Sequence, residues 1–201
     1  MPSARADLIA AESERHLRLL AIVRGDAWFM RALAAVRELA LPDGCIGAGA
    51  VRNLVWDAVH EKASPSAVSD VDVAYFDPAD ASAQRDADLQ RRLTMLCPGV
   101  PWEVTNQAGV HHWFEAHFGH AVAPLRSIDA AVASWPEFTT SVALSLAPDD
   151  SLRVMAPHGL ADLFDIVVRR NPARVSVATY RQRVEQKRYA ERWPRVRVVP
   201  C

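Results

Sequence analysis

The chain has 201 residues, of which 50% are hydrophobic and 23% are charged, as is typical of a soluble globular protein with a substantial core. Its formal net charge of −1 gives no overall basic field, which argues against generic DNA binding. The cysteines, Cys45, Cys97 and Cys201, lack CxxC spacing, and charged residues interrupt the N-terminal region where a signal peptide would be apolar. No stretch is apolar for long enough to span a bilayer, so we expect a cytoplasmic protein without a membrane partner.

The first half of the chain predicts alternating helices and strands. Residues 5–40 place apolar side chains near the 3.6-residue helical period and predict two helices with a break near Gly25-Asp26. A turn at 41–44 precedes a short buried strand at 45–48, and a helix is expected from about Ala50. A strand at 69–76, a helix at 80–96 and a strand at 101–107 follow.

The second half predicts helices at 109–118 and 127–133 and short strands at 140–146 and 152–155. A helix at 159–168, a longer helix at 176–191 and a short strand at 196–199 complete it. The sequence has no internal repeat and no low-complexity segment. We therefore expect one domain over 1–201, with N-terminal helices at 1–40, a core that carries the site at 41–125, and a C-terminal part at 126–201 packed on that core.

The run Asp70-Val71-Asp72-Val73 carries the strongest chemical signal. Alternate side chains of a strand share a face, so Asp70 and Asp72 project together while the two valines point into a core. Glu103, on the strand expected at 101–107, offers a third carboxylate. Magnesium prefers such oxygen ligands. The alternative is a half-buried strand that shows its carboxylates to water, and the pattern alone does not separate the two interpretations.

A second signal is the turn Gly47-Ala48-Gly49-Ala50, between a strand and a helix. Glycine lets the backbone approach a phosphate, and the N-terminus of a helix favours negative charge. Arg52, in the first helical turn, is either a forked phosphate ligand or a solvated surface arginine. The basic segment 180–188, which includes Lys187, is either a solvated face or a clamp for a triphosphate or an acidic acceptor.

The order of glycine turn, helix, Asp-x-Asp strand and later carboxylate resembles the polymerase-beta-like nucleotidyltransferase superfamily. More closely, the chain resembles a bacterial family of uncharacterised nucleotidyltransferase-like proteins. The matching blocks are residues 49–57, 70–77, 102–108 with His111, 135–137, 156–164 and 171–172. The resemblance implies an α/β (α+β) fold in which a short mixed sheet carries the site and helices from both ends of the chain flank it.

The resemblance also implies a function and a set of site residues. Magnesium, or manganese in its place, is expected on Asp70, Asp72 and Glu103, for transfer of a nucleoside monophosphate group from an NTP to an unidentified acceptor. RNA is among the acceptors that the sequence allows. The candidates for contact with the nucleotide and its phosphates are Gly49, Ala50, Arg52, Asn53, Asn106, Gln107, His111 and Lys187.

The sequence departs from the superfamily pattern in two places. Ala50 stands where a serine or a second glycine is usual, which removes one expected phosphate contact. The gap between Gly49 and Asp70 is longer than usual, and the loop 60–69 has room to cover the site or to contact an acceptor. Ala50 motivates one alternative, a nucleotide-binding or protein-interaction module without turnover. A metal-dependent phosphohydrolase that uses the same carboxylates is another.

Overall fold

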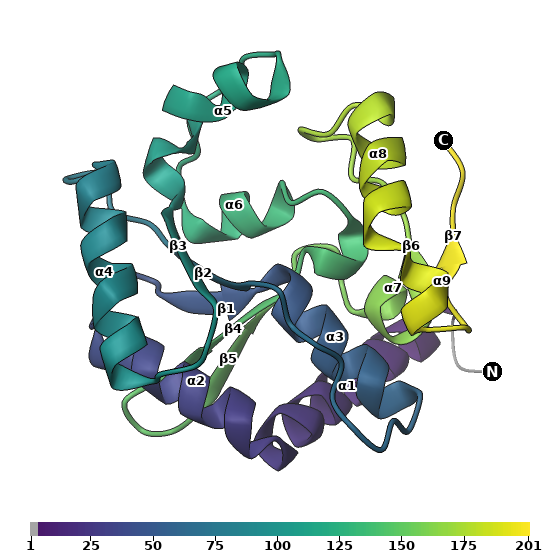
Figure 1. The fold of residues 1–201 in the computed structure, drawn as a ribbon. Helices are drawn as coiled ribbons and strands as arrows, with labels where there is room; N and C mark the ends of the chain where they lie inside the picture. The colour runs from purple at the N-terminus through teal and green to yellow at the C-terminus, as the bar shows by residue number, and fades with distance from the viewer. Residues whose placement is uncertain (1–3) are drawn as a thin grey trace.

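The computed structural model describes residues 4–201, and its centre is a five-stranded mixed sheet in the order β3-β2-β1-β4-β5 (Figure 1). The strands are β1 (Cys45–Gly47), β2 (Val71–Tyr75), β3 (Trp102–Asn106), β4 (Ala143–Leu146) and β5 (Leu152–Met155). Only β2 and β3 pair in parallel within this sheet of the described chain; the other neighbours are antiparallel. Parallel strands need a crossover, and α4 (Ala83–Leu96) supplies it.

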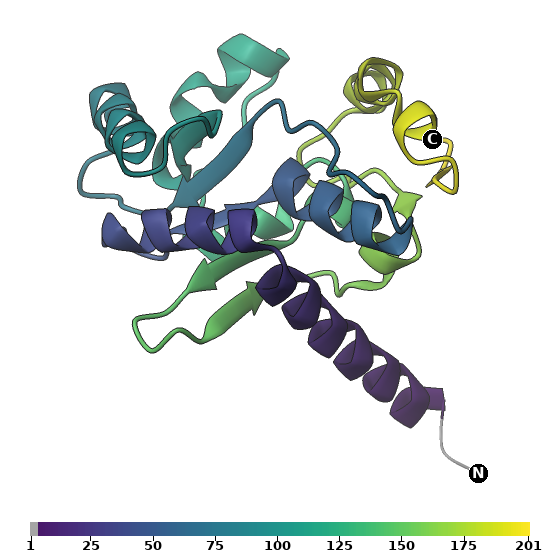
Figure 2. The same ribbon diagram turned by 60° about the horizontal axis from the view of Figure 1, so that its bottom comes forward.

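The N-terminal region forms two helices, α1 (Ala4–Gly25) and α2 (Ala27–Glu38), with the predicted break between them. Asp26 causes the second helix to start there, because its Oδ1 accepts a hydrogen bond from the Phe29 amide at 2.7 Å. Figure 2 shows α1 projecting from the body of the molecule. Leu19 and Val23, near its C-terminal end, are fully buried, whereas Leu8 and Leu17 are exposed.

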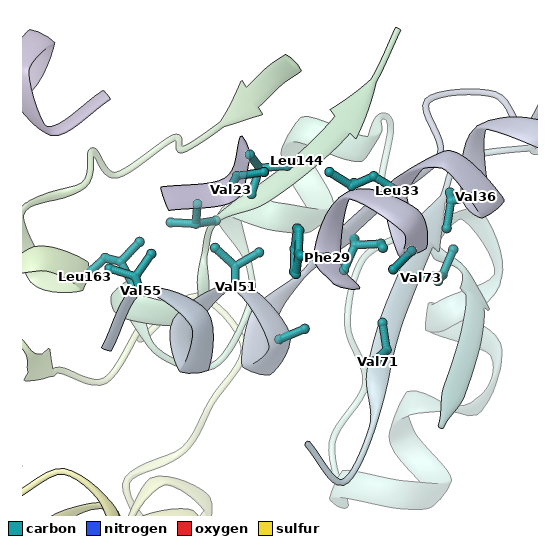
Figure 3. Packing of buried hydrophobic residues seen from close by; sticks show 14 of the residues in the cluster. Val23, Phe29, Leu33, Val36, Val51, Val55, Val71, Val73, Leu144 and Leu163 are labelled. Carbon is teal, nitrogen blue, oxygen red and sulfur yellow. The ribbon is translucent and has the colours of Figure 1, made fainter. Parts of the chain in front are cut away.

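One face of the sheet forms the main core. Ile46 of β1 lies opposite Val73 on one side and Leu144 on the other, so these side chains share a face. Figure 3 shows Val73 and Leu144 among apolar side chains from α2 and from α3 (Ala48–Val59), such as Leu33 and Val51, and Ile46 belongs to the same cluster. Each fully buried aliphatic side chain contributes on the order of 1.5–3 kcal/mol. The core therefore holds α3 firmly on β1 and β2.

The opposite face of the sheet is only partly covered. The helix α6 (Ile128–Ala133) packs on the small side chains of Cys45, Ala74 and Ala143. Asp72 lies two residues before Ala74 and therefore points to this same face. Because α6 packs over the end of β2 where Ala74 lies, the end that carries the aspartates stays open to a cleft.

The remaining elements after β3 are short. They are η1 (Gln107–Gly109), α5 (Val110–Phe118), η2 (Phe138–Thr140), α7 (Ala161–Phe164), β6 (Val167–Val168), α8 (Val177–Lys187), α9 (Tyr189–Arg192) and β7 (Arg197–Val198). Tyr189 and Trp193 join the main core, which thus includes residues from both ends of the described chain. No helix among residues 4–201 has the length and apolar character needed to cross a membrane.

Two predicted helices differ from the structure. The helix expected at 159–168 ends at Phe164, because Ile166 takes a left-handed φ of 56° and the next two residues pair in parallel with β7. The helix expected at 176–191 is divided at Arg188, whose φ is 48°. This break turns the chain so that α9 packs its Tyr189 into the core.

Candidate active site

The three predicted carboxylates line one cleft, whose volume is about 280 Å³. Asp72 lies directly opposite Glu103 in the parallel pairing of β2 and β3, and Asp70 immediately precedes β2. Val71 and Val73 are buried, so the strand has the alternation that the sequence predicts. The Ser69 hydroxyl donates a hydrogen bond to Oδ1 of Asp70 at 2.8 Å, which orients that carboxylate.

Asp72 is the carboxylate that its surroundings perturb most clearly. Burial raises the pKa of Asp72 to about 6, and repulsion from Asp70 and Glu103 adds to the effect. Lys187 and Arg183 act in the opposite direction and keep the pKa of Asp72 from rising further. A carboxylate so crowded by other negative charges gains from a nearby cation, and such perturbation is typical of functional sites.

The cleft fits a hard divalent cation that arrives together with a substrate. Among residues 4–201, no three His, Cys, Asp or Glu side chains already converge on a point where they would hold a metal ion. Magnesium does not need such a cage, because it keeps several waters and binds through one or two carboxylates together with substrate phosphates. Asp70, Asp72 and Glu103 supply oxygen ligands of this kind in a single cleft.

The N-terminus of α3 forms the wall of the cleft next to β1. Gly47 precedes the helix without any side-chain cap among the described residues, and Ala48 takes a left-handed φ of 52°. Ala48 and Gly49 both line the cleft. The first amides of a helix lack partners within the helix, and the helix dipole favours negative charge beside them. This wall is therefore suited to a phosphate group.

Arg52 lines the cleft as a buried cation rather than as a solvated surface residue. Arg52 is only 3% exposed. Its guanidinium carbon lies 5.1 Å from the Tyr189 ring centre and 5.6 Å from the Trp193 ring centre. One Nη donates a hydrogen bond to Oδ1 of Asn53 at 2.8 Å, while Nε has no partner among residues 4–201. Burial lowers the pKa of Arg52, since a buried cation is costly until an anion accompanies it.

The helix α8 brings two further cations to the cleft. Arg183 and Lys187 are four residues apart, so they lie on one side of that helix. Arg183 donates through Nε to Oε1 of Glu137 at 2.8 Å, and Glu137 is completely buried. Burial alone would lower the pKa of Arg183, but the Glu137 carboxylate outweighs burial, so the pKa of Arg183 is raised. Lys187 has no carboxylate partner within the described chain and is free to meet a ligand.

The comparison with known families agrees with this arrangement. Residues 34–198, which include all the cleft residues named above, match the model of a family described as nucleotidyltransferase. The chain belongs to this nucleotidyltransferase family. A search of curated proteins finds no match.

One solved structure shows the fold of the chain, and two others are less similar. One, described as an NMR structure that reveals a CCA-adding enzyme head domain, is 28% identical with a TM-score of 0.77, over 91% of this chain and 95% of that one. The fold is thus the expected polymerase-beta-like nucleotidyltransferase fold. The Thermotoga maritima CCA-adding enzyme complexed with tRNA is 14% identical, with a TM-score of 0.49, over 84% of this chain and 38% of that one. A tRNA-processing enzyme in an apo form is 16% identical with the same TM-score, over 84% and 42%.

The cleft collects some of the predicted nucleotide-binding residues and not others. Gly49, Arg52, Gln107 and Lys187 line it with the three carboxylates. Ala50 and Asn53 instead face a groove on the other side of α3. The loop 60–69, which by its length could cover the site or contact an acceptor, runs along the same groove and contributes residues such as Lys62 and Ser66 there.

Asn106 and His111 have other surroundings. Asn106 is buried and shapes the turn after β2: it accepts from the Asp77 amide at 3.1 Å and donates to the carbonyls of Asp77 and Asp80 at 2.7 and 2.9 Å. His111, on α5, packs its ring against His112 with 3.9 Å between the ring centres. Neither is among the residues that line the cleft, so the structure does not bring them to the carboxylates.

Several cleft residues were not singled out by the sequence. Thr105 shares the exposed face of β3 with Glu103, a position that strand alternation indicates. Trp135 and Pro136 fall in a block that carries the family resemblance, and Arg183 lies in the predicted basic segment. Thr140 has no such signal, because it reaches the cleft only through the packing of η2, to which it belongs.

Proposed function

We propose that this protein transfers a nucleoside monophosphate group from an NTP to the hydroxyl of an acceptor. The observation that carries the proposal is the adjacency of opposite charges in one cleft. Asp70, Asp72 and Glu103 gather on one wall, and the α3 N-terminus with Arg52 and Lys187 forms another. Cations suit the phosphates of an NTP, and carboxylates suit the divalent cation that accompanies them.

Each group has a defined part in this reaction. The start of α3, Arg52 and Lys187 bind the β- and γ-phosphates and hold the triphosphate in one orientation. Magnesium bound by Asp70, Asp72 and Glu103 would neutralise the charge that builds up during transfer. Glu103 takes the proton of the acceptor hydroxyl. That oxygen forms a bond to the α-phosphorus while the bond from phosphorus to the bridging oxygen breaks, and pyrophosphate leaves.

The position of Ala50 bears on the alternative of a module without turnover. Ala50 is 3% exposed and faces the groove on the other side of α3, so its methyl group does not take the place of a phosphate contact in the cleft. Ala48 and Gly49 form the cleft wall instead. The departure at Ala50 therefore no longer argues against catalysis, which supports the enzymatic proposal over the binding module.

Release of pyrophosphate tests the proposal. Purified protein is incubated with magnesium, each of the four NTPs labelled at the α-phosphate, and a fractionated cell extract as the source of acceptors. We expect pyrophosphate and a labelled acceptor from the unaltered protein and neither from an Asp70→Asn, Asp72→Asn double variant. Asp88→Asn, at an exposed position of α4, is the matched control and should behave like the unaltered protein.

Two results would contradict the proposal. Equal pyrophosphate release by the double variant would show that the cleft carboxylates do not act in the reaction. Orthophosphate as the product, with no label on any acceptor, would indicate the phosphohydrolase instead.

A further inference from the structure

A second hollow opens from the cleft on the side of Glu103 that is away from α3. Its volume is about 220 Å³. Asp72, Glu103, Trp135 and Arg183 line both spaces, so two of the three carboxylates lie at the junction. Beyond the junction, the second hollow is lined by Trp113, Phe114, Phe118, Arg174 and Thr179. It has no role in the reaction as described so far.

An aromatic wall forms one side of the second hollow. The helix α5 contributes Trp113, Phe114 and Phe118. The helix α8, which lies across from α5 in Figure 1, contributes Thr179 and Arg183 on the other side. Trp113 is 44% exposed and Phe118 38% exposed, which leaves large apolar surfaces facing solvent. Rings exposed within a hollow offer flat surfaces on which a planar group can stack.

A cation stands beside this wall. The guanidinium carbon of Arg174 lies 5.6 Å from the Phe114 ring centre, and its Nη2 donates to the Ala123 carbonyl at 2.6 Å. Arg174 forms no ion pair with any carboxylate of residues 4–201, and burial lowers its pKa. The remaining guanidinium N–H groups are therefore available for an anionic group of a ligand.

The direction of the reaction decides which substrate enters the second hollow. This step rests on the proposed function. The α3 wall, Arg52 and Lys187 line the cleft and are absent from the lining of the second hollow, so pyrophosphate would leave on the α3 side. In phosphoryl-type transfer the attacking oxygen approaches roughly in line with the leaving oxygen, from the opposite side. The acceptor must then come from the side of Glu103.

We propose that the second hollow binds the acceptor, and that the acceptor is a ribonucleotide with a free hydroxyl. Its base stacks on the exposed ring of Trp113, its phosphate meets Arg174, and its sugar hydroxyl points toward Glu103. A free mononucleotide and the terminal nucleotide of an RNA strand both have this chemistry. The combination of aromatic surface, an arginine without a carboxylate partner among residues 4–201 and a nearby carboxylate favours such a ligand over a ring-free alcohol.

Equilibrium binding to the full chain tests the proposal. The α,β-methylene analogues of the four NTPs are titrated first, with magnesium, to measure binding at the cleft. With the analogue that binds held at saturation, three acceptor probes are then titrated: the 5′-mononucleotides, tetraribonucleotides with a free 3′ hydroxyl, and ribose 5-phosphate, which lacks a base. Saturation with the analogue prevents the probes from occupying the NTP position.

We expect Trp113→Ala and Arg174→Gln to weaken nucleotide-probe binding roughly five- to hundredfold and to change analogue binding less than twofold. Trp113→Phe and Arg174→Lys should retain most of the affinity. Met95→Ala and Arg91→Gln, both exposed on α4, are matched controls and should leave both affinities unchanged. Thermal unfolding of each variant shows that it is folded. Tighter binding of the tetraribonucleotides would identify an RNA end, and equal binding would identify a free nucleotide.

Three results would overturn the proposal while the proposed function stands. The first is loss of analogue affinity in Trp113→Ala, which would place the NTP base in the second hollow. The second is binding of ribose 5-phosphate as tightly as the mononucleotides. The third is binding of the analogue without binding of any nucleotide probe. Failure of every analogue to bind the unaltered protein would overturn the proposed function itself, and the acceptor assignment with it.

Discussion

Gly47 and Trp135 are fitted against each other beside the cleft. A Cβ atom on Gly47 would lie 2.5 Å from two carbons of the Trp135 ring and 3.0 Å from Cβ of Ala143. The absence of a side chain at the end of β1 therefore lets the indole lie against the sheet, where it lines both the cleft and the second hollow. The glycine thus serves the packing of a cleft wall as well as the turn into α3.

This packing predicts that Gly47→Ala is destabilising. The added methyl group overpacks a closed site, and we expect a loss of about 1–3 kcal/mol in the free energy of unfolding. Gly49→Ala is the matched control, because the nearest atom to its new Cβ would be Nη2 of Arg52 at 3.7 Å, an ordinary contact. Chemical denaturation measures both. Equal stability of the two variants would contradict the account, and a Trp135→Leu change should restore part of the loss in Gly47→Ala.

The ion pair between Arg183 and buried Glu137 predicts that loss of Arg183 lowers the free energy of unfolding by more than Gly47→Ala does. Arg183→Met leaves the Glu137 carboxylate without its cation, although the Thr140 hydroxyl still donates to Oε2 at 3.0 Å. Removing one partner of a buried pair typically costs about 3–5 kcal/mol, and we expect the lower end because Arg183 is partly exposed. Arg181→Met, at an exposed position of the same helix, should be nearly neutral. Addition of Glu137→Gln to Arg183→Met should recover stability; no recovery would argue against the pair as the cause.

The raised pKa of Asp72 predicts that Asp72→Asn stabilises the metal-free protein at neutral pH but not at acidic pH. Since the pKa of Asp72 is raised from 3.8 to about 6 by folding, its ionisation opposes folding, and the stability present below pH 3.8 is lost as the pH rises through 6. Asp72→Asn removes this loss. Above pH 7 in EDTA we expect the variant to be more stable by roughly 1–3 kcal/mol, with no difference near pH 3.8. Thermal unfolding across this range measures it, and a variant less stable than the unaltered protein at pH 7 would refute it.

Lys187 predicts an effect of a single side chain on nucleotide affinity. Loss of a charged hydrogen bond to phosphate costs about 1.5–3 kcal/mol, so Lys187→Ala should weaken binding of a magnesium–NTP analogue roughly ten- to hundredfold. The other lysine of the chain, Lys62, pairs with Asp57 at 3.5 Å beside the groove on the far side of α3, so Lys62→Ala is the control. Calorimetry at two salt concentrations measures both. Equal affinity of the two variants would remove Lys187 from the phosphate site.

Local patterns in the sequence predicted most elements and the face on which the carboxylates lie. The period-2 alternation around Asp70 and Asp72 fixes their common direction at the start of β2, and the helical period together with Asp26 marks the break between α1 and α2. Two helices were overextended because the left-handed residues Ile166 and Arg188 are not glycines, so no residue type signalled the breaks.

The sequence by itself determined the Asp70 and Asp72 pair and the turn before α3, because each depends on residues close together along the chain, and its separate matching blocks indicated the family. Only the tertiary structure decided which residues share the cleft. It turned Ala50 and Asn53 to the other side of α3, buried Arg52, and brought Arg183, Lys187 and Arg174 from the C-terminal part to the carboxylates and the aromatic wall of α5. The physical reason is that such contacts join segments far apart in the chain. They arise from the packing of whole helices on the sheet, and no local periodicity encodes them.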